Sequence, residues 1–226
     1  YSLQVVPQHR DEQGRLESVV VATHNISMVK HAEELSYQDK LTGLRNRNYL
    51  ESRGDSLVNE DLPVSVIMVD CNYLKRTNDI YGHEMGDELL RRTASVLRRV
   101  AGADYLPMRL GGDEFIFAMP GFHSAAAADV ARRLIDVFSR PFEVGGHELT
   151  VTPSLGISIY PHDGYDLETL LRNADTAMYQ AKEIGRNAFQ FYSSEMNSKS
   201  LDRLLMESNL RRALNQNEFV LHYQPL

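Results

Sequence analysis

Several features of secreted, membrane and nucleic-acid-binding proteins are absent from this sequence of 226 residues. Its single cysteine, Cys71, cannot form a disulfide within the chain, which favours a reducing, cytoplasmic compartment. No apolar run approaches the length of a membrane span, so we expect no membrane contact from this part of the protein. The net charge of −7 argues against binding of nucleic acid. No signal peptide is visible, but the chain begins at Tyr1, so a longer parent protein can still be membrane-anchored.

What is present is the composition of an ordinary globular protein, with 42% hydrophobic and 24% charged residues. The length suffices for one sizeable core with attached fragments. We expect four zones, at residues 1–27, 28–38, 39–192 and 193–226. The first reads as a two-stranded hairpin around a turn that contains Gly14, and a lone hairpin is marginal in water. It is therefore expected to be the end of a domain that lies upstream.

The main zone alternates between the periodicities of strands and helices. Strands are expected at 63–70, 105–110, 114–119, 142–144, 149–160 and 188–192, and helices at 84–100, 124–139 and 167–184. A helix at 196–216 and a strand at 219–226 should follow. This mixture predicts an α+β fold, a sheet with helices packed on it.

Residues 28–38 form an expected helix that leads without glycine or proline into Asp39. A continuous helix would be a stiff connector between two domains. A simple linker is the equally weighted alternative.

Acidic residues stand at two places where the expected sheet ends. Asp70 closes an apolar strand, and Asp113 and Glu114 follow the Gly111-Gly112 pair of a hairpin. If the strands are neighbours, these carboxylates converge, and paired Mg²⁺ ions bound by carboxylates are a recurrent device for phosphoryl transfer. For any one residue alone, a capping or solvated role would be favoured.

Basic and amide side chains add a set that suits a nucleotide. Lys75, just after the Asp70 strand, can meet phosphates, and Lys182 and Arg186 are four apart near a helix end and would share one face. Asn78 and Asp87 can together read a guanine edge. Each has a plain alternative: a solvated lysine, cations favoured by a helix C-terminus, and a first-turn carboxylate. His83, between Asn78 and Asp87, reads more readily as a local cap than as a catalytic group.

Four motifs in order resemble those of GGDEF-family diguanylate cyclases. They occupy residues 39–47, 70–87, 109–115 and 175–187, and the third reads Arg109-Leu110-Gly111-Gly112-Asp113-Glu114-Phe115. A lone Gly-Gly-Asp-Glu-Phe would be weak, whereas four ordered motifs over about 150 residues are highly specific. The resemblance implies a fold like the palm of nucleotide cyclases and polymerases: a central, mainly antiparallel sheet surrounded by helices.

The resemblance also implies a role for each matched residue. It assigns metal binding to Asp70, the Cys71 carbonyl, Asp113 and Glu114, catalysis to Asp113, Glu114 and Lys75, and substrate binding to Asn78, His83, Asp87, Gly111, Gly112, Lys182 and Arg186. Asp113 would also be the base for the 3′-hydroxyl. The implied cofactor is Mg²⁺, two ions per active site, with Mn²⁺ as an alternative.

The implied activity is the condensation of two GTP into cyclic di-GMP with release of two pyrophosphates. One domain binds one GTP, so a homodimer is needed for catalysis, and the helix at 28–38 would set the relative orientation of two domains. The alternative is a non-catalytic GTP-binding module that regulates a C-terminal EAL phosphodiesterase. Residues 19–27 resemble the end of a PAS sensor domain, and 219–225 resemble the first strand of an EAL domain whose remainder is absent.

Two positions depart from the family pattern. Asn72 stands where many members have a second aspartate, and we expect activity to survive because the metal role belongs to Asp70. The family's product-inhibition site is an Arg-x-x-Asp that lies shortly before the signature. Here that window reads Gly102-Ala103-Asp104-Tyr105, so we expect no feedback inhibition through it.

Overall fold

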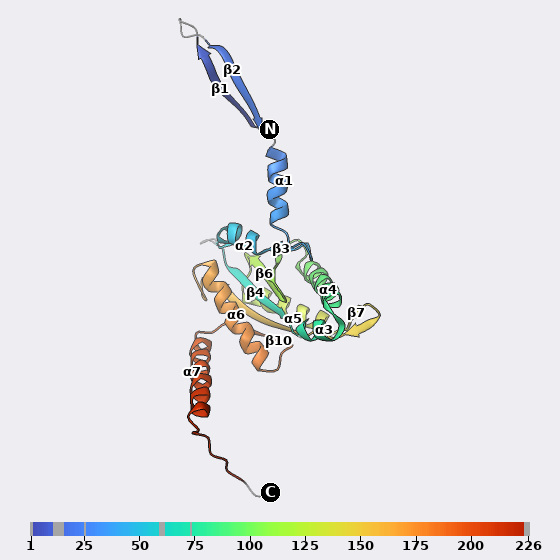
Figure 1. Cartoon of the computed structure of the whole chain (residues 1–226), viewed down its shortest axis with the longest axis vertical. Helices are drawn as coiled ribbons and strands as arrows, with labels where there is room; N and C mark the ends of the chain where they lie inside the picture. Colours follow the sequence, from blue (N-terminus) through green and yellow to red (C-terminus); the bar gives the residue numbers. More distant parts are fainter. Residues whose placement is uncertain (1, 11–15, 25, 59–61, 73, 224–226) are drawn as a thin grey trace.

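The computed structural model describes residues 2–10, 16–24, 26–58, 62–72 and 74–223 (Figure 1). The strands are β1 (Ser2–Arg10), β2 (Leu16–His24), β3 (Arg45–Asn46), β4 (Val64–Cys71), β5 (Leu106–Gly111), β6 (Glu114–Pro120), β7 (Phe142–Val144), β8 (His147–Leu149), β9 (Pro153–Tyr160) and β10 (Ala188–Phe191). The helices are α1 (Ile26–Ser36), α2 (Arg47–Arg53), α3 (Leu74–Tyr81), α4 (His83–Ala101), α5 (Ser124–Phe138), α6 (Leu167–Glu183) and α7 (Glu195–Asn215), with a 3-10 turn at Gly54–Leu57.

A six-stranded sheet with the order β10-β9-β4-β6-β5-β3 forms the centre of the molecule. The three inner pairings are antiparallel, and the two outer ones, β10 with β9 and β3 with β5, are parallel. The α+β class and the mainly antiparallel sheet are thus confirmed. Among the expected elements, β5 and β6 form the hairpin around Gly111-Gly112.

Helices cover both faces of the sheet, and the alternation of side chains along β4 assigns each residue to one of them. Ile67, Val69 and Cys71 belong to the larger core cluster, which includes the buried residues of α4 and α5. Val66 and Met68 belong to a second cluster with Leu50 of α2 and the buried residues of α6. Because every residue of β4 is buried, this alternation predicts that Asp70 lies on the α6 face.

Gly156 of β9 explains how closely α6 can approach the sheet. A Cβ at this position would overlap the Ala174 carbonyl oxygen and the Met178 backbone nitrogen. The absence of a side chain therefore allows the backbone of α6 to lie directly on β9. On the same face, Ser158 Oγ donates to the Leu170 carbonyl at 2.7 Å, which fixes the helix along the strand.

The N-terminal hairpin of β1 and β2 is antiparallel, as expected, and α1 links it to the main body (Figure 1). The helix expected at 28–38 is present as α1, which begins at Ile26 and ends at Ser36, two residues before the expected end. There Asn46 Nδ2 donates to the Ser36 carbonyl at 2.8 Å and Gln38 bridges to Arg45. The helix thus ends where side chain and backbone partners of the main domain replace its own hydrogen bonds.

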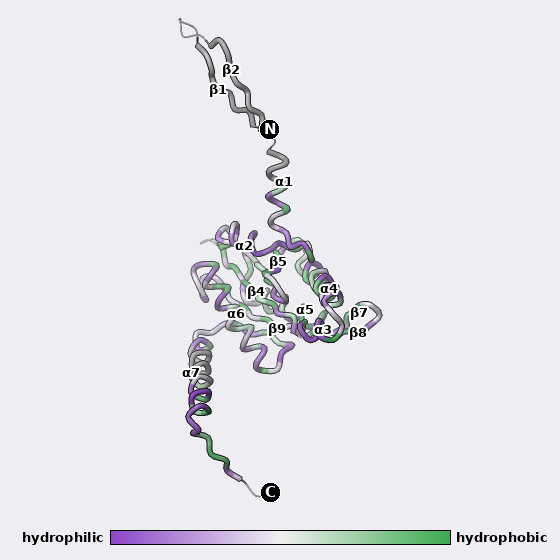
Figure 2. Tube along the Cα trace, viewed as in Figure 1, coloured by the Kyte–Doolittle hydropathy of each residue, from purple (hydrophilic) through white to green (hydrophobic). Residues whose placement is uncertain are grey.

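Two other boundaries differ from the sequence predictions. The expected strand at 149–160 is divided between β8 and β9, because Thr152 turns its carbonyl toward Asn72 and Pro153 has no N–H for a ladder. The expected strand at 219–226 is wrong for the described residues 219–223, which have no partner strand to pair their backbone groups. The apolar segment after α7, green in Figure 2, is instead exposed, with Leu221 at 83%. Residues 224–226 lie outside the described range.

None of the helices in the described ranges is both long and apolar enough to cross a bilayer.

Candidate active site

Two acidic residues face each other where the central strands β4 and β6 meet. Asp70, next to last in β4, lies opposite Glu114, the first residue of β6. Because directly opposed residues of an antiparallel pair point to the same face, both carboxylates lie on the α6 side. The convergence predicted from the sequence is therefore confirmed for this pair.

The Gly-Gly turn brings Asp113 to the same end of the sheet. Gly112 has a φ of +51°, a left-handed conformation that favours glycine, and a Cβ there would meet open space. The Asp113 carbonyl accepts a hydrogen bond from the Cys71 N–H at 3.2 Å. The hairpin is thereby tied to the end of β4, with Gly111 and Gly112 leaving its outer surface free of side chains.

Lys182, in the last turn of α6, forms an ion pair with Asp70. Its Nζ lies 2.7 Å from Asp70 Oδ2, and the side chain of Asp70 is 9% exposed. The alternative that Asp70 merely caps the following helix is wrong, because its partner comes from α6. A carboxylate buried this deeply requires such a compensating charge.

The electrostatics at this end of the sheet reflect crowded negative charge. Burial raises the pKa of Asp70, the Lys182 ammonium opposes that rise, and the charges of Asp113 and Asp175 add to it. Burial also raises the pKa of Glu114, again with the carboxylates of Asp175, Asp113 and Asp70 contributing. These closely spaced carboxylates therefore favour the binding of a cation.

The donor set at this place fits Mg²⁺. The described ranges contain no group of three or more His, Cys, Asp or Glu side chains arranged to hold a metal ion. Mg²⁺, however, is usually bound by only one or two carboxylates together with substrate phosphates and water. Asp70 and Asp113 are hard oxygen donors whose mutual repulsion a cation would relieve.

Cys71 can contribute to the site only through its backbone. Its side chain is 1% exposed, and burial raises the pKa of its thiol to about 12. Its Sγ lies 4.0 Å from Thr93 Oγ1, on the α4 face. The thiol is therefore protonated and points away from the carboxylates, in agreement with the expectation that any metal contact involves the carbonyl.

A second group of predicted site residues lies on α3 and α4. Lys75 is exposed in the first turn of α3, and Asn78 lies one turn later. His83 is the exposed first residue of α4, and Asp87 follows at the i+4 position of the same helix face. Gly82 is the N-cap of α4, so the prediction that His83 is a local cap is wrong.

Close contact between α3 and α4 positions Asn78. A Cβ at Gly86 would overlap Asn78 Oδ1, so the amide of Asn78 lies directly on the backbone of α4. Oδ1 is buried and has no hydrogen-bond partner among the described residues. Because Gly86 precedes Asp87, this contact places the amide of Asn78 beside the turn of α4 that carries Asp87.

Arg186 does not share a helical face with Lys182, contrary to the prediction from their spacing. The helix α6 ends at Glu183, and Arg186 lies in the following turn with a φ of +61°. Its N–H donates to the Ala181 carbonyl at 3.1 Å, a hydrogen bond that folds the chain back at the helix end. The side chain is exposed, and the two cations therefore extend from different local structures.

Three residues that the sequence analysis did not assign to the site lie beside it: Arg109, its partner Asp39, and Asp175. Arg109 donates to the Gly112 carbonyl from Nε at 3.1 Å and from Nη2 at 2.8 Å, and its Nη1 lies 3.0 Å from Asp39 Oδ1. It therefore joins the Gly-Gly turn to the first motif. Asp175 lies on α6 seven residues before Lys182, so the two residues share one face of the helix. This spacing is the sequence signal that could have assigned Asp175 to the site.

Asn72, which departs from the family pattern, has a structural role. It is 6% exposed, and its Nδ2 donates to the Thr152 carbonyl at 2.6 Å and to Ser154 Oγ at 2.9 Å. The side chain of an aspartate at this position would have no N–H to donate. The amide therefore joins the chain after β4 to the beginning of β9, beside Asp70.

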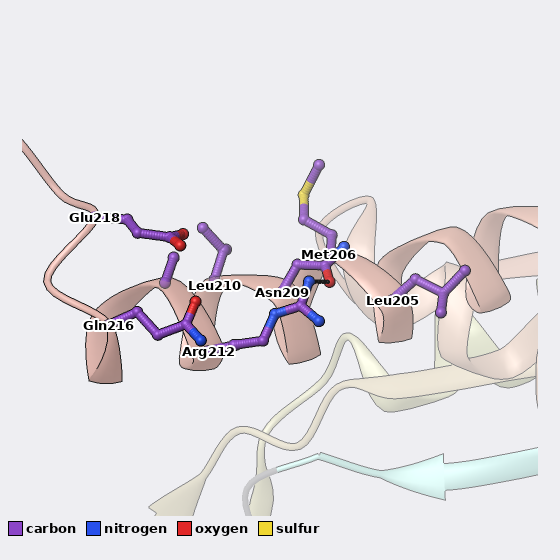
Figure 3. A pocket seen from close by; sticks show the side chains of 8 residues that line it. Leu205, Met206, Asn209, Leu210, Arg212, Gln216 and Glu218 are labelled. Atoms are coloured by element: carbon purple, nitrogen blue, oxygen red, sulfur yellow. Dashed lines mark hydrogen bonds between the residues drawn. The ribbon is translucent and has the colours of Figure 1, made fainter.

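A hollow of about 710 Å³ lies on the α6 side, and Glu114 is the one predicted site residue in its lining, with Asp175 beside it. A separate hollow lies along α7, where Leu205, Met206 and Leu210 stand beside Arg212 (Figure 3). The dashed line there marks the Arg212 Nη2 hydrogen bond to Asn209 Oδ1 at 3.0 Å. None of the lining residues of this second hollow belongs to the predicted site.

Comparison with known proteins agrees with this arrangement. Residues 36–188 match the family of the diguanylate cyclase GGDEF domain. The chain belongs to the GGDEF family. This match includes all four motifs and ends two residues beyond Arg186.

Relatives of the GGDEF domain include long signalling proteins. An uncharacterised signalling protein of Caulobacter vibrioides is 38% identical over 99% of this chain and 29% of its own length. The bifunctional diguanylate cyclase/cyclic di-GMP phosphodiesterase MucR of Pseudomonas aeruginosa is 37% identical over 91% of this chain and 31% of its own length. The chain thus spans about a third of these relatives.

A solved structure also resembles this GGDEF domain. The crystal structure of a sensory box/GGDEF family protein from Caulobacter crescentus is 41% identical, with a TM-score of 0.62. The similarity covers 66% of this chain and 99% of the crystallised one. The GGDEF fold, a mixed six-stranded sheet surrounded by helices, is therefore shown.

Proposed function

We propose that this GGDEF domain is a diguanylate cyclase that condenses two GTP molecules into cyclic di-GMP. The observation that carries the proposal is the opposed pair of Asp70 and Glu114 at the end of the sheet, with Asp113 joined to it through the Cys71 N–H. Raised carboxyl pKa values at this place indicate a site that favours a bound cation. Family membership points to Mg²⁺ as this cation, since GGDEF cyclases generally use Mg²⁺.

Each residue then has a defined part in the reaction. Asp70, Asp113 and the Cys71 carbonyl would hold Mg²⁺, two ions per site, with Glu114 supporting the metal site. The bound metal would supply positive charge against the phosphates. Asp113 takes the proton of a 3′-hydroxyl, and that oxygen forms a bond to the α-phosphorus of the other GTP. The bond from this phosphorus to the bridging oxygen breaks, and pyrophosphate leaves. Two such steps close the cyclic dinucleotide.

The second group binds the substrate. Asp87 accepts from the guanine N1–H and N2–H₂ groups, and Asn78 completes the recognition of the base edge beside it. Lys75, Lys182 and Arg186 contact phosphate oxygens. Lys182 Nζ lies 2.7 Å from Asp70 Oδ2, so a triphosphate bound here would compete with this carboxylate for the same ammonium group.

Two domains must face each other, because each binds a single GTP. We expect α1 to set this orientation, and its end is firmly attached: Arg45 Nη1 lies 2.8 Å from Glu34 Oε2, and Asn46 holds the Ser36 carbonyl. The specific rate should therefore rise with protein concentration. The identity of 1–27 as the end of a PAS domain and of 193–226 as a linker and the start of an EAL domain remains a prediction.

The test is a product assay with GTP and Mg²⁺, in which cyclic di-GMP is separated and quantified. Asp113→Asn should lower the rate by a factor of about 10² or more while GTP binding persists, because a base and a metal ligand are lost and the shape is kept. Asp104→Asn is the matched control. Asp104 is exposed and precedes β5, at the opposite end of that strand from the Gly-Gly turn, so its loss should leave the rate unchanged.

Binding of GTP without product, at protein concentrations that produce dimers, would contradict the cyclase assignment. That result would instead support a non-catalytic GTP-binding module that regulates an EAL phosphodiesterase. Equal losses in Asp113→Asn and Asp104→Asn would contradict the role of Asp113.

A further inference from the structure

A third hollow lies in the helical layer on the other face of the sheet. It has a volume of about 790 Å³ and is lined by one side of α4, the end of α5 and the hairpin of β7 and β8. Figure 1 shows β7 beside α4, away from α6. None of the residues of the proposed active site lines this hollow, and neither does the window Gly102–Tyr105.

Arginines dominate the charge of this hollow. Arg92 and Arg99 come from α4 and Arg140 follows α5, whereas Glu143 is the one acidic residue in the lining. The chain as a whole carries a net charge of −7, so a site with three arginines and one glutamate differs in sign from the average surface. Such a local excess of positive charge attracts anions.

Two of these arginines have their guanidinium groups available. Arg92 Nε lies 3.0 Å from Glu88 Oε1, so part of its charge is compensated. In the described part of the chain, neither Arg99 nor Arg140 forms a side-chain hydrogen bond or ion pair. An unpaired guanidinium offers up to five N–H donors in a geometry that matches a phosphate group.

The remaining lining is mixed. Val96, Val137, Pro141 and Phe142 form apolar parts of the wall, and Ser95, Glu143, Gly145 and Gly146 complete it. The volume is in the range of small-molecule sites, which combine apolar walls with a few polar groups. Inorganic phosphate would leave these walls unused, whereas a molecule with a flat organic part and a phosphate would use both.

We propose that this hollow is a second nucleotide site, in which Arg99 and Arg140 bind phosphate and the base lies against Phe142 and Pro141. The site is separate from the proposed active site and does not depend on cyclase activity. It requires no divalent cation, because the protein supplies the positive charge.

Binding is measured on the whole chain labelled with ¹⁵N-arginine, by following the side-chain Nε–Hε signals in the presence of a metal chelator. GMP, inorganic phosphate and guanosine are the three probes. Substitutions Arg99→Gln and Arg140→Gln identify the two signals. We expect GMP to shift both, inorganic phosphate to shift them with at least 10-fold weaker affinity, and guanosine to leave them unchanged.

The double substitution Arg99→Gln, Arg140→Gln should weaken GMP binding at least 10-fold. Arg132→Gln, which removes an exposed arginine that pairs with Asp129 on α5, is the matched control and should leave binding unchanged. Affinity should also fall with added salt.

Three outcomes would overturn the proposal. The first is the absence of any shift of the Arg99 and Arg140 signals with GMP. The second is equal affinity for GMP and inorganic phosphate, which would show a simple anion contact. The third is a loss of stability without a change in binding in the double variant, which would show that these arginines only balance the C-terminal dipoles of α4 and α5. Since none of these readouts is cyclic di-GMP formation, failure here is distinguishable from failure of the proposed function.

Discussion

The two halves of the proposed active site are held in place by different physical means. Asp70 and Glu114 lie where paired strands end, so the hydrogen-bond register of β4 and β6 fixes their spacing. Asn78 and Asp87 lie on two consecutive helices, α3 and α4. The contact between these helices depends on the absence of a Cβ at Gly86. We infer that the catalytic half is rigid, and that the guanine half can adjust when side chains turn.

The largest expected effect concerns the rigid half. Gly156→Ala would place a Cβ against backbone atoms of α6, at the Ala174 carbonyl and the Met178 nitrogen, which cannot move aside independently. We expect the free energy of unfolding to fall by about 3 kcal/mol, measured by urea denaturation. Ser158→Ala, two residues along the same face, removes only a hydrogen bond and should cost about 1 kcal/mol. Equal losses in the two variants would contradict the close approach of α6.

The second effect concerns the support of the Gly-Gly turn. Burial alone would raise the pKa of Asp39, but hydrogen bonds from Thr42 and Arg109 outweigh burial and hold that pKa below its ordinary value of 3.8. Arg109→Leu removes the guanidinium donors from Asp39, which keeps its hydrogen bonds from Thr42, and from the Gly112 carbonyl. We expect a loss of about 2 kcal/mol in unfolding free energy.

The same pair gives a pH dependence. A carboxyl whose pKa is lowered by folding stabilises the native state above pH 3.8, and this contribution is lost as the pH falls through the folded pKa. The stability difference between wild type and Arg109→Leu should therefore shrink in acid. A difference that stays constant from neutral pH to below pH 3 would contradict this account.

The third effect concerns the adjustable half. Gly86→Ala also introduces an overlap, but with the side-chain amide of Asn78 and not with backbone. Because Asn78 can turn and alanine favours a helix, we expect the unfolding free energy to change by less than about 1 kcal/mol. The KM for GTP should rise several-fold while kcat changes little, as steady-state kinetics would show. A change in kcat alone would contradict the placement of Asn78 in substrate binding.

The smallest effect concerns the crowded carboxylates. Since the pKa of Glu114 is raised above its ordinary value of 4.5, its charge destabilises the folded state at neutral pH, and this penalty disappears as the pH falls below 4.5. Glu114→Gln should therefore raise the unfolding free energy by about 0.5 kcal/mol at pH 7, a value discounted for solvent screening, and by nothing in acid. Glu148→Gln, an exposed substitution on β8, controls for the loss of one charge. An advantage that persists below pH 4 would contradict the electrostatic cause.

The sequence predicted the rigid half better than the adjustable one, for physical reasons. Strand periodicity and the Gly-Gly turn predicted that Asp70 and Glu114 would converge, because strand geometry is regular. The partner of Asp70, Lys182, is distant in sequence, and only the packing of α6 on Gly156 brings the two together. The end of α1 before Tyr37 depends on a tertiary hydrogen bond from Asn46, which periodicity does not reveal. The end of α6 agrees with the expected helix to within one residue, but the local turn that takes Arg186 off the helix face was not predicted.

The most direct test of the account is a comparison of Asp113→Asn and Asp87→Asn in one experiment that measures GTP affinity, preference for GTP over ATP, and the rate of cyclic di-GMP formation. We predict that Asp113→Asn retains affinity and base preference but loses the product by a factor of about 10² or more. Asp87→Asn should lose affinity and base preference, and saturating GTP should restore much of its rate. If both variants lose affinity and rate to the same extent, the division into a catalytic and a guanine-binding half is contradicted.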